Sequence, residues 1–179
     1  IREFLHGYYG RAAAHLAHYL RLVHDRALAI PRYDGSIAIQ RSLQRHGFDH
    51  PHKDGCYLDL NSPGDAPYLD PDTMLAAARH FAAAEQAVAG DPAVLARVQA
   101  AKLAVWYVLL TRWHVMRAHA DATGQAWLLP ADRAAACAEF TRIAVAAGIT
   151  HLAEGWAKRD LEWLTALCAG GQDAETYDG

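Results

Sequence analysis

The sequence predicts an all-α protein, a bundle of about five helices with one long irregular loop over about residues 32–69. Three observations support this prediction. Apolar residues recur along several segments with the i, i+3, i+4, i+7 spacing of a helix that buries one face. Asp-Pro and Pro-Ala-Asp starts precede three of those segments and have the chemistry of helix N-termini. Alanine supplies much of the 53% hydrophobic content and favours helix over strand.

The first ten residues are typical of a helix end. Residues 1–5 resemble a last helical turn, and Gly10 offers the permissive backbone that closes a helix. Because no initiator Met precedes them, we expect the chain to be a C-terminal fragment of a larger protein. Residues 11–29 then form an amphipathic helix, which Pro31 ends. Its predicted inward positions are Leu16, Tyr19, Leu20, Val23 and Ala27.

The long loop carries turn residues and a group of metal-capable side chains. A short helix over Ser36–His46 and an extended piece over Cys56–Leu60 are the regular structure that it allows. The metal-capable side chains are His46, His50, His52 and Cys56. Their spacing matches no common zinc module, so a solvent-facing or ligand-rim loop is the favoured interpretation. The role of this loop stays open.

Three further helices have well-marked starts. Asp70-Pro71-Asp72 begins a helix that reaches Gly90, and Asp91-Pro92 begins another that reaches about residue 119 or 120. Pro130-Ala131-Asp132 begins a third, which stops at Gly148. The middle of the second, Leu103–Leu110, is apolar nearly all round, so this helix should be the central one. A last helix covers about residues 152–169, and the polar tail from residue 172 is expected to fray.

Composition excludes some classes of function and leaves others open. At 179 residues the chain is one domain, long enough to bury roughly 70% of its unfolded surface. A net charge of -3 with scattered arginines gives no electrostatic case for binding nucleic acid. Leu103–Leu110 is far shorter than the roughly 18 residues of a membrane span, so no membrane contact is predicted. The three cysteines do not have the spacing of a metal site, and their odd number argues against a disulfide framework. The compartment stays undetermined.

Eleven histidines make metal binding the first chemical hypothesis to weigh. His15 and His18 are neighbours on one helix surface, and a third ligand from another helix, His114 or His119, would complete a divalent-metal site. His114 and His119 point to different sides of their helix, so only one of them would serve. A structural role on the helix shoulders is the favoured alternative, and no cofactor is predicted. The metal hypothesis corresponds to a bundle of the DinB-like kind.

Two other residues are candidates for a ligand-contacting role. Glu154 lies with His151 and Trp156 in a short loop-to-helix segment, although a structural role such as capping explains it better than catalysis. Trp127 is the most loop-like tryptophan and suits either sugar stacking or a hydrophobic staple for the helix that follows, with the staple favoured. No nucleophile elbow and no glycine-rich phosphate loop is present in the sequence. The sequence therefore predicts no self-contained catalytic machinery.

The segment Glu3-Phe4-Leu5-His6-Gly7-Tyr8-Tyr9-Gly10-Arg11-Ala12-Ala13, continuing to Tyr19-Leu20, resembles the C-terminal part of the bacterial "domain of unknown function 4838" proteins. The Tyr68-Leu69-Asp70-Pro71 start and Gly148-Ile149-Thr150 with Glu154 are also similar. That group overlaps glycoside hydrolase family 163, so the resemblance implies a parent protein with endo-β-N-acetylglucosaminidase-like activity. In the family the acid–base residues belong to a preceding (β/α)8 barrel, so no catalytic residue carries over. The resemblance also implies an exported or periplasmic parent.

The resemblance implies a non-catalytic helical accessory domain that braces a catalytic barrel and rims its carbohydrate cleft. Its partner is the preceding catalytic domain, with carbohydrate as a candidate ligand. The candidate interface or rim residues are Tyr8, Tyr9, Trp127 and Glu154. This hypothesis predicts an apolar surface around Leu5, Tyr8 and Tyr9. The alternatives are the metal-binding bundle and a plain oligomerisation module.

Overall fold

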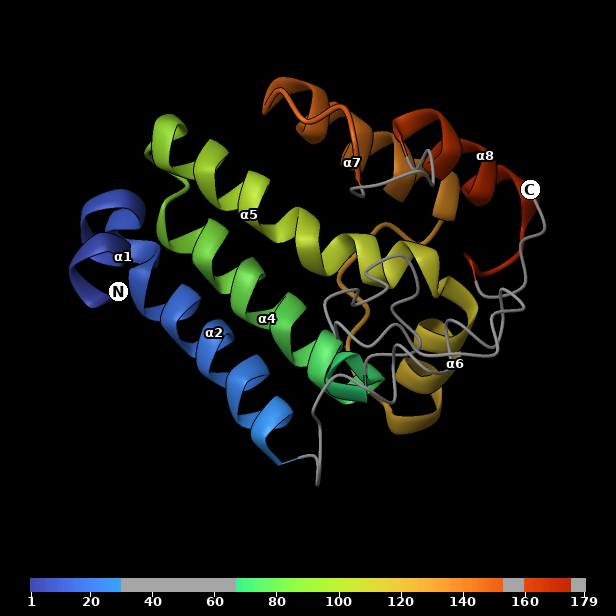
Figure 1. Ribbon diagram of the computed structural model, residues 1–179, viewed down its shortest axis with the longest axis horizontal. Coiled ribbons are helices and arrows are strands. Elements are labelled where there is room, and N and C mark those ends of the chain that lie inside the picture. The colour runs from blue at the N-terminus through green and yellow to red at the C-terminus, as the bar shows by residue number, and fades with distance from the viewer. Residues whose placement is uncertain (30–66, 153–159, 175–179) are drawn as a thin grey trace, which may run out of the picture.

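The computed structural model describes residues 1–29, 67–152 and 160–174, and these ranges are helical with no strand (Figure 1). The predicted all-α bundle is therefore confirmed. In chain order the elements are α1 (Arg2–Tyr9), the 3-10 helix η1 (Gly10–Ala12), α2 (Ala13–Leu28), the 3-10 helix η3 (Pro67–Leu69), α4 (Pro71–Ala87), α5 (Pro92–Thr111), α6 (Trp113–Thr123), α7 (Arg133–Ala146) and α8 (Leu161–Gly170).

The helices pack on both sides of α5. On one side α4 lies against α5 and α2 lies against α4, with α1 across the start of α2 (Figure 1). On the other side α7 and α8 pack against each other and against α5. One hydrophobic core joins these elements, and its largest fully buried side chains include Phe81, Leu109, Met116, Phe140 and Leu164. The helix that contains Leu103–Leu110, α5, therefore has the predicted central position.

By length and mean hydropathy alone, α5 would also suffice to cross a membrane. The apolar stretch is thus longer than the eight residues singled out in the sequence. A core helix meets the same two criteria, and α5 has helices packed on several sides. Its buried Lys102 donates to Glu85 on α4 at 2.8 Å and lies over the ring of Trp106 at 4.3 Å. An apolar surface on all sides, with its one lysine paired, is what a helix at the centre of a bundle requires.

Aspartate side chains begin four of the helices. The acceptor carboxylates of Asp70, Asp91, Asp132 and Asp160 receive the backbone N–H groups of the residues three positions later at 2.8–3.1 Å. The predicted starts of α4 and α5 are confirmed. The predicted Pro130-Ala131-Asp132 start of α7 is also confirmed, with Asp132 as the cap and Arg133 as the first helical residue. By contrast, α8 begins after its own cap Asp160 and not at residue 152.

The single helix predicted from residue 91 to about residue 120 is wrong, because it breaks at Arg112. There φ is -120° and ψ is 38°, which ends α5 and starts α6. Just before the break, the hydroxyl of Thr111 donates to the carbonyls of Tyr107 and Val108, a contact that bends helices. Just after it, the carboxylate of Asp173 accepts the N–H groups of His114 and Val115 at 3.1 and 3.2 Å. A distant side chain therefore caps α6.

The prediction of a frayed tail is wrong for residues 172–174. Asp173 is buried with 7% of its surface exposed, and its cap on α6 holds the chain in place. The carbonyl of Gln172 accepts a hydrogen bond from Arg133 at 2.8 Å. The polar residues 172–173 thus complete the bundle, since Asp173 accepts hydrogen bonds from N–H groups in the first turn of α6, which have no partner within that helix.

Several sequence predictions fall outside the described residues. These are the short helix over Ser36–His46, the extended piece over Cys56–Leu60, the histidine-rich stretch from His46 to Cys56, and Glu154. Of the predicted loop, the described end holds η3, whose Leu69 carbonyl accepts a hydrogen bond from Arg112 at 3.1 Å.

Candidate functional site

Three aromatic side chains gather at the N-terminal end of the bundle. Phe4 and Tyr8 lie one helical turn apart on α1, and their rings stack with centroids 5.3 Å apart. Tyr9 meets both rings edge-on, at 6.5 Å from Phe4 and 4.9 Å from Tyr8. We call Phe4, Tyr8 and Tyr9 the N-terminal aromatic cluster. Its rings support one another in the offset and edge-to-face geometries that aromatic pairs prefer.

Most of this cluster faces outward. Phe4 is 61% exposed and Tyr8 is 41% exposed, beside an Ile1 that is 93% exposed. Tyr9 is half-buried against the core, and burial, followed by the neighbouring Tyr8, raises the pKa of its hydroxyl. Leu5 differs from the prediction, because it is 5% exposed and belongs to the core. The predicted apolar surface is therefore made of Phe4 and Tyr8, with Leu5 beneath it.

Arg97 of α5 holds the cluster in place. Its guanidinium lies 4.7 Å from the centroid of the Tyr8 ring, and its Nη1 donates to the Tyr8 carbonyl at 2.9 Å. A cation over one ring and a hydrogen bond to the backbone fix both the end of α1 and the orientation of Tyr8. The exposed aromatic surface is thus preorganised, and a partner would not need to order it.

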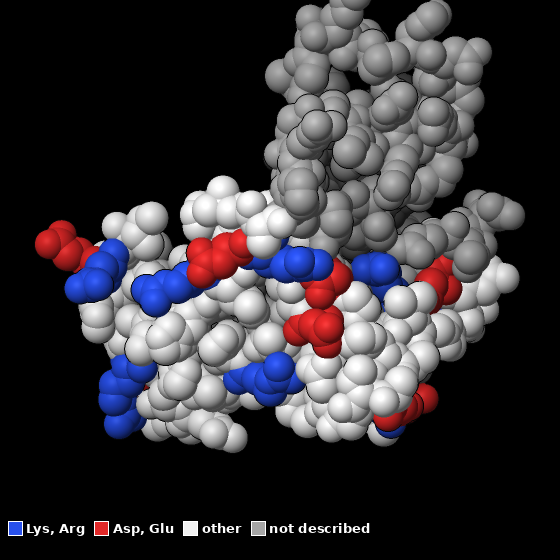
Figure 2. Space-filling model, turned by 90° about the horizontal axis from the view of Figure 1, so that it is seen from below, with Lys and Arg blue, Asp and Glu red and all other residues white. Residues whose placement is uncertain are grey.

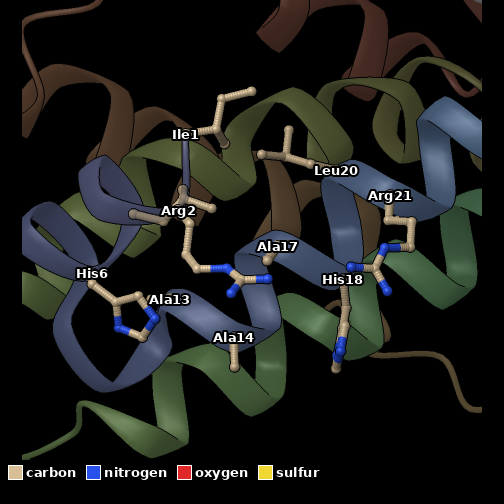
Figure 3. A pocket seen from close by; sticks show the side chains of 10 residues that line it. Ile1, Arg2, His6, Ala13, Ala14, Ala17, His18, Leu20 and Arg21 are labelled. Atoms are coloured by element: carbon tan, nitrogen blue, oxygen red, sulfur yellow. The ribbon is translucent and has the colours of Figure 1, made fainter.

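An open groove of about 410 Å³ lies between α1 and α2 (Figure 3). Small alanines form part of its lining, and Ile1 and Leu20 lie along one edge, where Leu20 is 46% exposed. The outward position of Leu20 contradicts the predicted inward face of α2. In the described ranges the main neighbours of this helix are α1 and α4, so its buried face is narrower than predicted.

Basic side chains line this groove. Arg2 extends from α1 toward Ala17 on α2, and Figure 3 places His6 and Arg21 at the same opening. On the face that Figure 2 shows, basic and acidic side chains lie next to one another, so charges of both signs mix there. The groove thus combines apolar lining with positive charge at its rim.

His18 also lines the groove, and its ring faces His80 of α4 with centroids 5.7 Å apart. Burial, then the neighbouring His18 and His15, lowers the pKa of His80. The structure thus brings His15 and His18 to a histidine of the adjacent helix that the sequence analysis did not select. Within residues 1–29, 67–152 and 160–174, no set of three or more His, Cys, Asp or Glu side chains is arranged to hold a metal ion.

His114 and His119 have partners elsewhere. The Nε2 of His114 lies 2.8 Å from the carbonyl oxygen of Gly171, next to the Asp173 cap. The Nε2 of His119 lies 2.7 Å from Asp72, which also accepts from Gln125 at 2.6 Å. Hydrogen bonds from His119 and Gln125 lower the pKa of Asp72. Both histidines therefore link helices through single polar contacts.

Trp127 has a packed position. Its ring meets Trp113 edge-on at 4.9 Å, Arg117 lies 5.4 Å from its centroid, and its Nε1 donates to the Pro130 carbonyl at 3.3 Å. These contacts hold Trp127 against α6 and the segment before α7, so its ring is packed against protein. Glu154, the other rim candidate, lies outside the described residues.

No protein-family model matches the chain, and neither a curated protein nor a solved structure gives a match.

Two residues of the site were missed by sequence reasoning. Phe4 belongs to the Glu3–Ala13 segment that carries the family resemblance but was not selected as an interface residue. Its i, i+4 spacing to Tyr8 predicts the observed stacking. His80 lies in a helix whose position the sequence predicted well, but its contact with His18 depends on how α2 and α4 are aligned. Spacing along one chain segment does not contain that information.

Proposed function

We propose that this bundle is a non-catalytic docking domain that braces a neighbouring domain through the N-terminal aromatic cluster. In line with the family resemblance, the partner is a preceding glycoside-hydrolase-like catalytic barrel of the same polypeptide. The observation that carries the proposal is the exposure of Phe4 and Tyr8 in a fixed, stacked arrangement.

Energetics favour this end of the molecule as an interface. Covering a Phe or Tyr side chain that is left in water contributes roughly 1.5–3 kcal/mol. Phe4 and Tyr8 are adjacent, so one partner surface would cover both. Since Arg97 already orients Tyr8, docking would lose little side-chain entropy there. Aromatic residues and arginine are also the side chains that most often dominate binding energy at interfaces.

The groove defines the chemistry of the partner surface. Its rim carries Arg2, His6 and Arg21, while Ile1 and Leu20 are apolar. A complementary surface presents an apolar patch to the aromatic cluster and carboxylates to the groove. A helix or loop of the barrel that bears Asp or Glu beside aliphatic side chains fits this description.

The experiment compares this chain with the longer polypeptide obtained from the coding sequence upstream of Ile1. Hydroxyl-radical footprinting measures solvent access to Phe4 and Tyr8 in both proteins. The proposal expects at least several-fold lower labelling of these two rings in the longer protein. Val145 on α7 is 64% exposed and far along the chain, so its labelling should stay the same and serves as the internal control.

A matched pair of variants extends this test. In the longer protein, Phe4→Ser with Tyr8→Ser should make the joint between the domains sensitive to protease, whereas Val145→Ser should not. Equal labelling of Phe4 and Tyr8 in the two proteins would contradict the docking role. An upstream sequence without the alternating strands and helices of a barrel would contradict the identity of the partner.

A second candidate function, divalent-metal binding, is favoured by one contact. His18 and His80 present imidazole rings to each other across α2 and α4, and His15 lies one turn away on α2. Two imidazoles on adjacent helices are able to chelate a borderline ion such as Zn²⁺ after small side-chain rotations. His15 would have to turn toward them to complete a three-histidine site.

Titration of the purified protein with Zn²⁺ tests this candidate. We expect His80→Gln to weaken one binding event at least tenfold. His24→Gln is the matched control, because His24 is exposed on the same helix as His18. Any other histidine that binds zinc is present in both variants. The difference between the two titration curves therefore reports the contribution of His80. Identical titration curves for the two variants would eliminate the site.

A further inference from the structure

The interface between α7 and α8 holds two free cysteines side by side. Cys137 on α7 is 3% exposed and Cys168 on α8 is 7% exposed. Both residues line the same groove, and the Sγ of Cys137 lies 3.8 Å from the carbonyl oxygen of Leu164, about one helical turn before Cys168. These residues are far apart in the sequence, so the pairing comes from the packing of the two helices.

A groove leads to this pair. An opening of about 480 Å³ between α7 and α8 is lined by both thiols, by small side chains and by Arg142, which is exposed. The small residues are Ala134, Ala138, Thr141, Thr165 and Ala169. Because the long side chain of Arg142 extends into solvent and the other lining residues are small, a small molecule is able to approach the sulfur atoms without unfolding the bundle. Each cysteine thus exposes little surface, and this surface faces the open groove.

The surroundings make the two thiols chemically different. The pKa of Cys137 is lowered to about 7 because Cys168 donates a hydrogen bond to its thiolate, which outweighs burial; Thr165, Thr141 and the charge of Arg133 act in the same direction. The hydrogen bond with Cys137 and burial raise the pKa of Cys168. Cys137 is therefore the better nucleophile, and Cys168 is a protonated neighbour within reach of it.

We propose that Cys137 and Cys168 form a reversible dithiol–disulfide site that reacts with small-molecule disulfides entering the groove between α7 and α8. The Cys137 thiolate attacks one sulfur of the small disulfide, forming a mixed disulfide and releasing one small thiolate. Cys168 then loses its proton to solvent and attacks the Sγ of Cys137, which forms the Cys137–Cys168 bond and releases the second small thiolate. The two cysteines are oxidised, and the small disulfide is reduced to two thiols.

The geometry allows this bond after a small adjustment. A disulfide needs its sulfurs roughly 2.05 Å apart and its Cβ atoms roughly 3.8 Å apart. Both side chains line one groove between adjacent helices, so rotation of the two side chains and a slight approach of α7 and α8 would bring the sulfurs to that distance. The product would lock α8 to α7 and close a loop of roughly 30 residues, which restricts the unfolded chain and raises Tm. This site does not depend on the docking role proposed for the opposite end.

The test uses the Cys56→Ser protein, which removes the third cysteine. The folded protein is incubated with oxidised glutathione, quenched by alkylation and analysed by mass spectrometry of intact protein and peptides. The expected product has lost two hydrogens, carries no glutathione and contains a peptide pair joined through Cys137 and Cys168. Dithiothreitol should restore both thiols.

Single variants assign the two roles. With Cys168→Ala the reaction should stop at a glutathione adduct on Cys137, and with Cys137→Ala the remaining thiol should react at least tenfold more slowly. If either variant fails to fold, the alkylation rates of the two cysteines in the Cys56→Ser protein give the same ranking. In the Cys56→Ser protein, which keeps Cys168, the rate at which the Cys137 thiol is consumed should rise with pH around a midpoint near 7. Native protein that keeps both thiols free, while unfolded protein reacts, would overturn the proposal, as would equal rates for the two cysteines.

Discussion

The two ends of the bundle use their distinctive residues in opposite ways. At the N-terminal end, Phe4 and Tyr8 are exposed, and Arg97 orients them without covering them. At the C-terminal end, Arg133 and Asp173 are each 7% exposed and hold the start of α6, the start of α7 and the last described residues together. We therefore expect substitutions at the N-terminal end to change the proposed docking and those at the C-terminal end to change stability.

The largest effect is expected for Arg133→Leu. Arg133 donates to the carbonyls of Leu110 and Gln172 at 2.8 Å, and its Nη2 lies 3.8 Å from Asp173. Leucine would leave two carbonyls without their donor and Asp173 buried without a nearby cation. Removing one partner of a buried charged pair costs about 3–5 kcal/mol. Urea unfolding followed by circular dichroism measures this change in the free energy of unfolding.

Arg142→Ala is the matched control for this prediction. Arg142 is an exposed arginine on the same helix, so its removal should change stability by no more than about 0.5 kcal/mol. A cost below about 1 kcal/mol for Arg133→Leu would mean that the C-terminal end does not depend on its buried charges.

An intermediate effect is expected for Asp70→Ala, at the joint between α2 and α4. Asp70 accepts the N–H and the hydroxyl of Thr73 at 3.1 and 2.8 Å, and the Nε of Arg26 at 2.6 Å. Loss of an N-cap costs about 1 kcal/mol, with a range of roughly 0.5–2. The ion pair with Arg26 is partly exposed and adds at most about 1 kcal/mol.

The pH dependence of this variant has a defined sign. Burial alone would raise the pKa of Asp70, but hydrogen bonds from Arg26 and Thr73 outweigh it and lower the pKa. A carboxyl whose folded pKa is depressed stabilises the protein above its unfolded pKa and loses this contribution as pH falls through the folded value. The difference between wild type and Asp70→Ala should therefore be constant near neutral pH and shrink below about pH 4. A difference that grows on acidification would contradict this account.

Local chemistry made much of the fold predictable. Asp70 and Asp91 each precede a proline, and both cap helices as predicted. The apolar stretch around Val105 marked the central helix because a helix without a polar face has to be covered on several sides. In each case the residues that decide the structure are neighbours in the chain.

Distant contacts account for what the sequence did not show. The break at Arg112 is stabilised by Asp173, which caps α6 from the end of the chain. The pairings of His18 with His80 and of Cys137 with Cys168 depend on which faces of the helices meet. Helical periodicity indicates the buried face of one helix but not its rotation against the next. In α1, Tyr8 is exposed as predicted, whereas Leu5 is buried and not at the surface.

The smallest change in stability is expected for Phe4→Ser combined with Tyr8→Ser. Phe4 is 61% exposed and Tyr8 is 41% exposed, so the folded chain loses little buried area. It loses their mutual stacking, worth about 0.5–1.5 kcal/mol, together with the edge-on contacts to Tyr9 and the Arg97 cation over Tyr8. Urea unfolding should detect a cost of about 1–2 kcal/mol, because water already covers the outer faces of the rings. A cost above about 3 kcal/mol, the size of a core truncation, would show that both rings are needed to build the bundle itself. In that case the contrast between the two ends would disappear, and the exposed aromatics would no longer identify a binding surface.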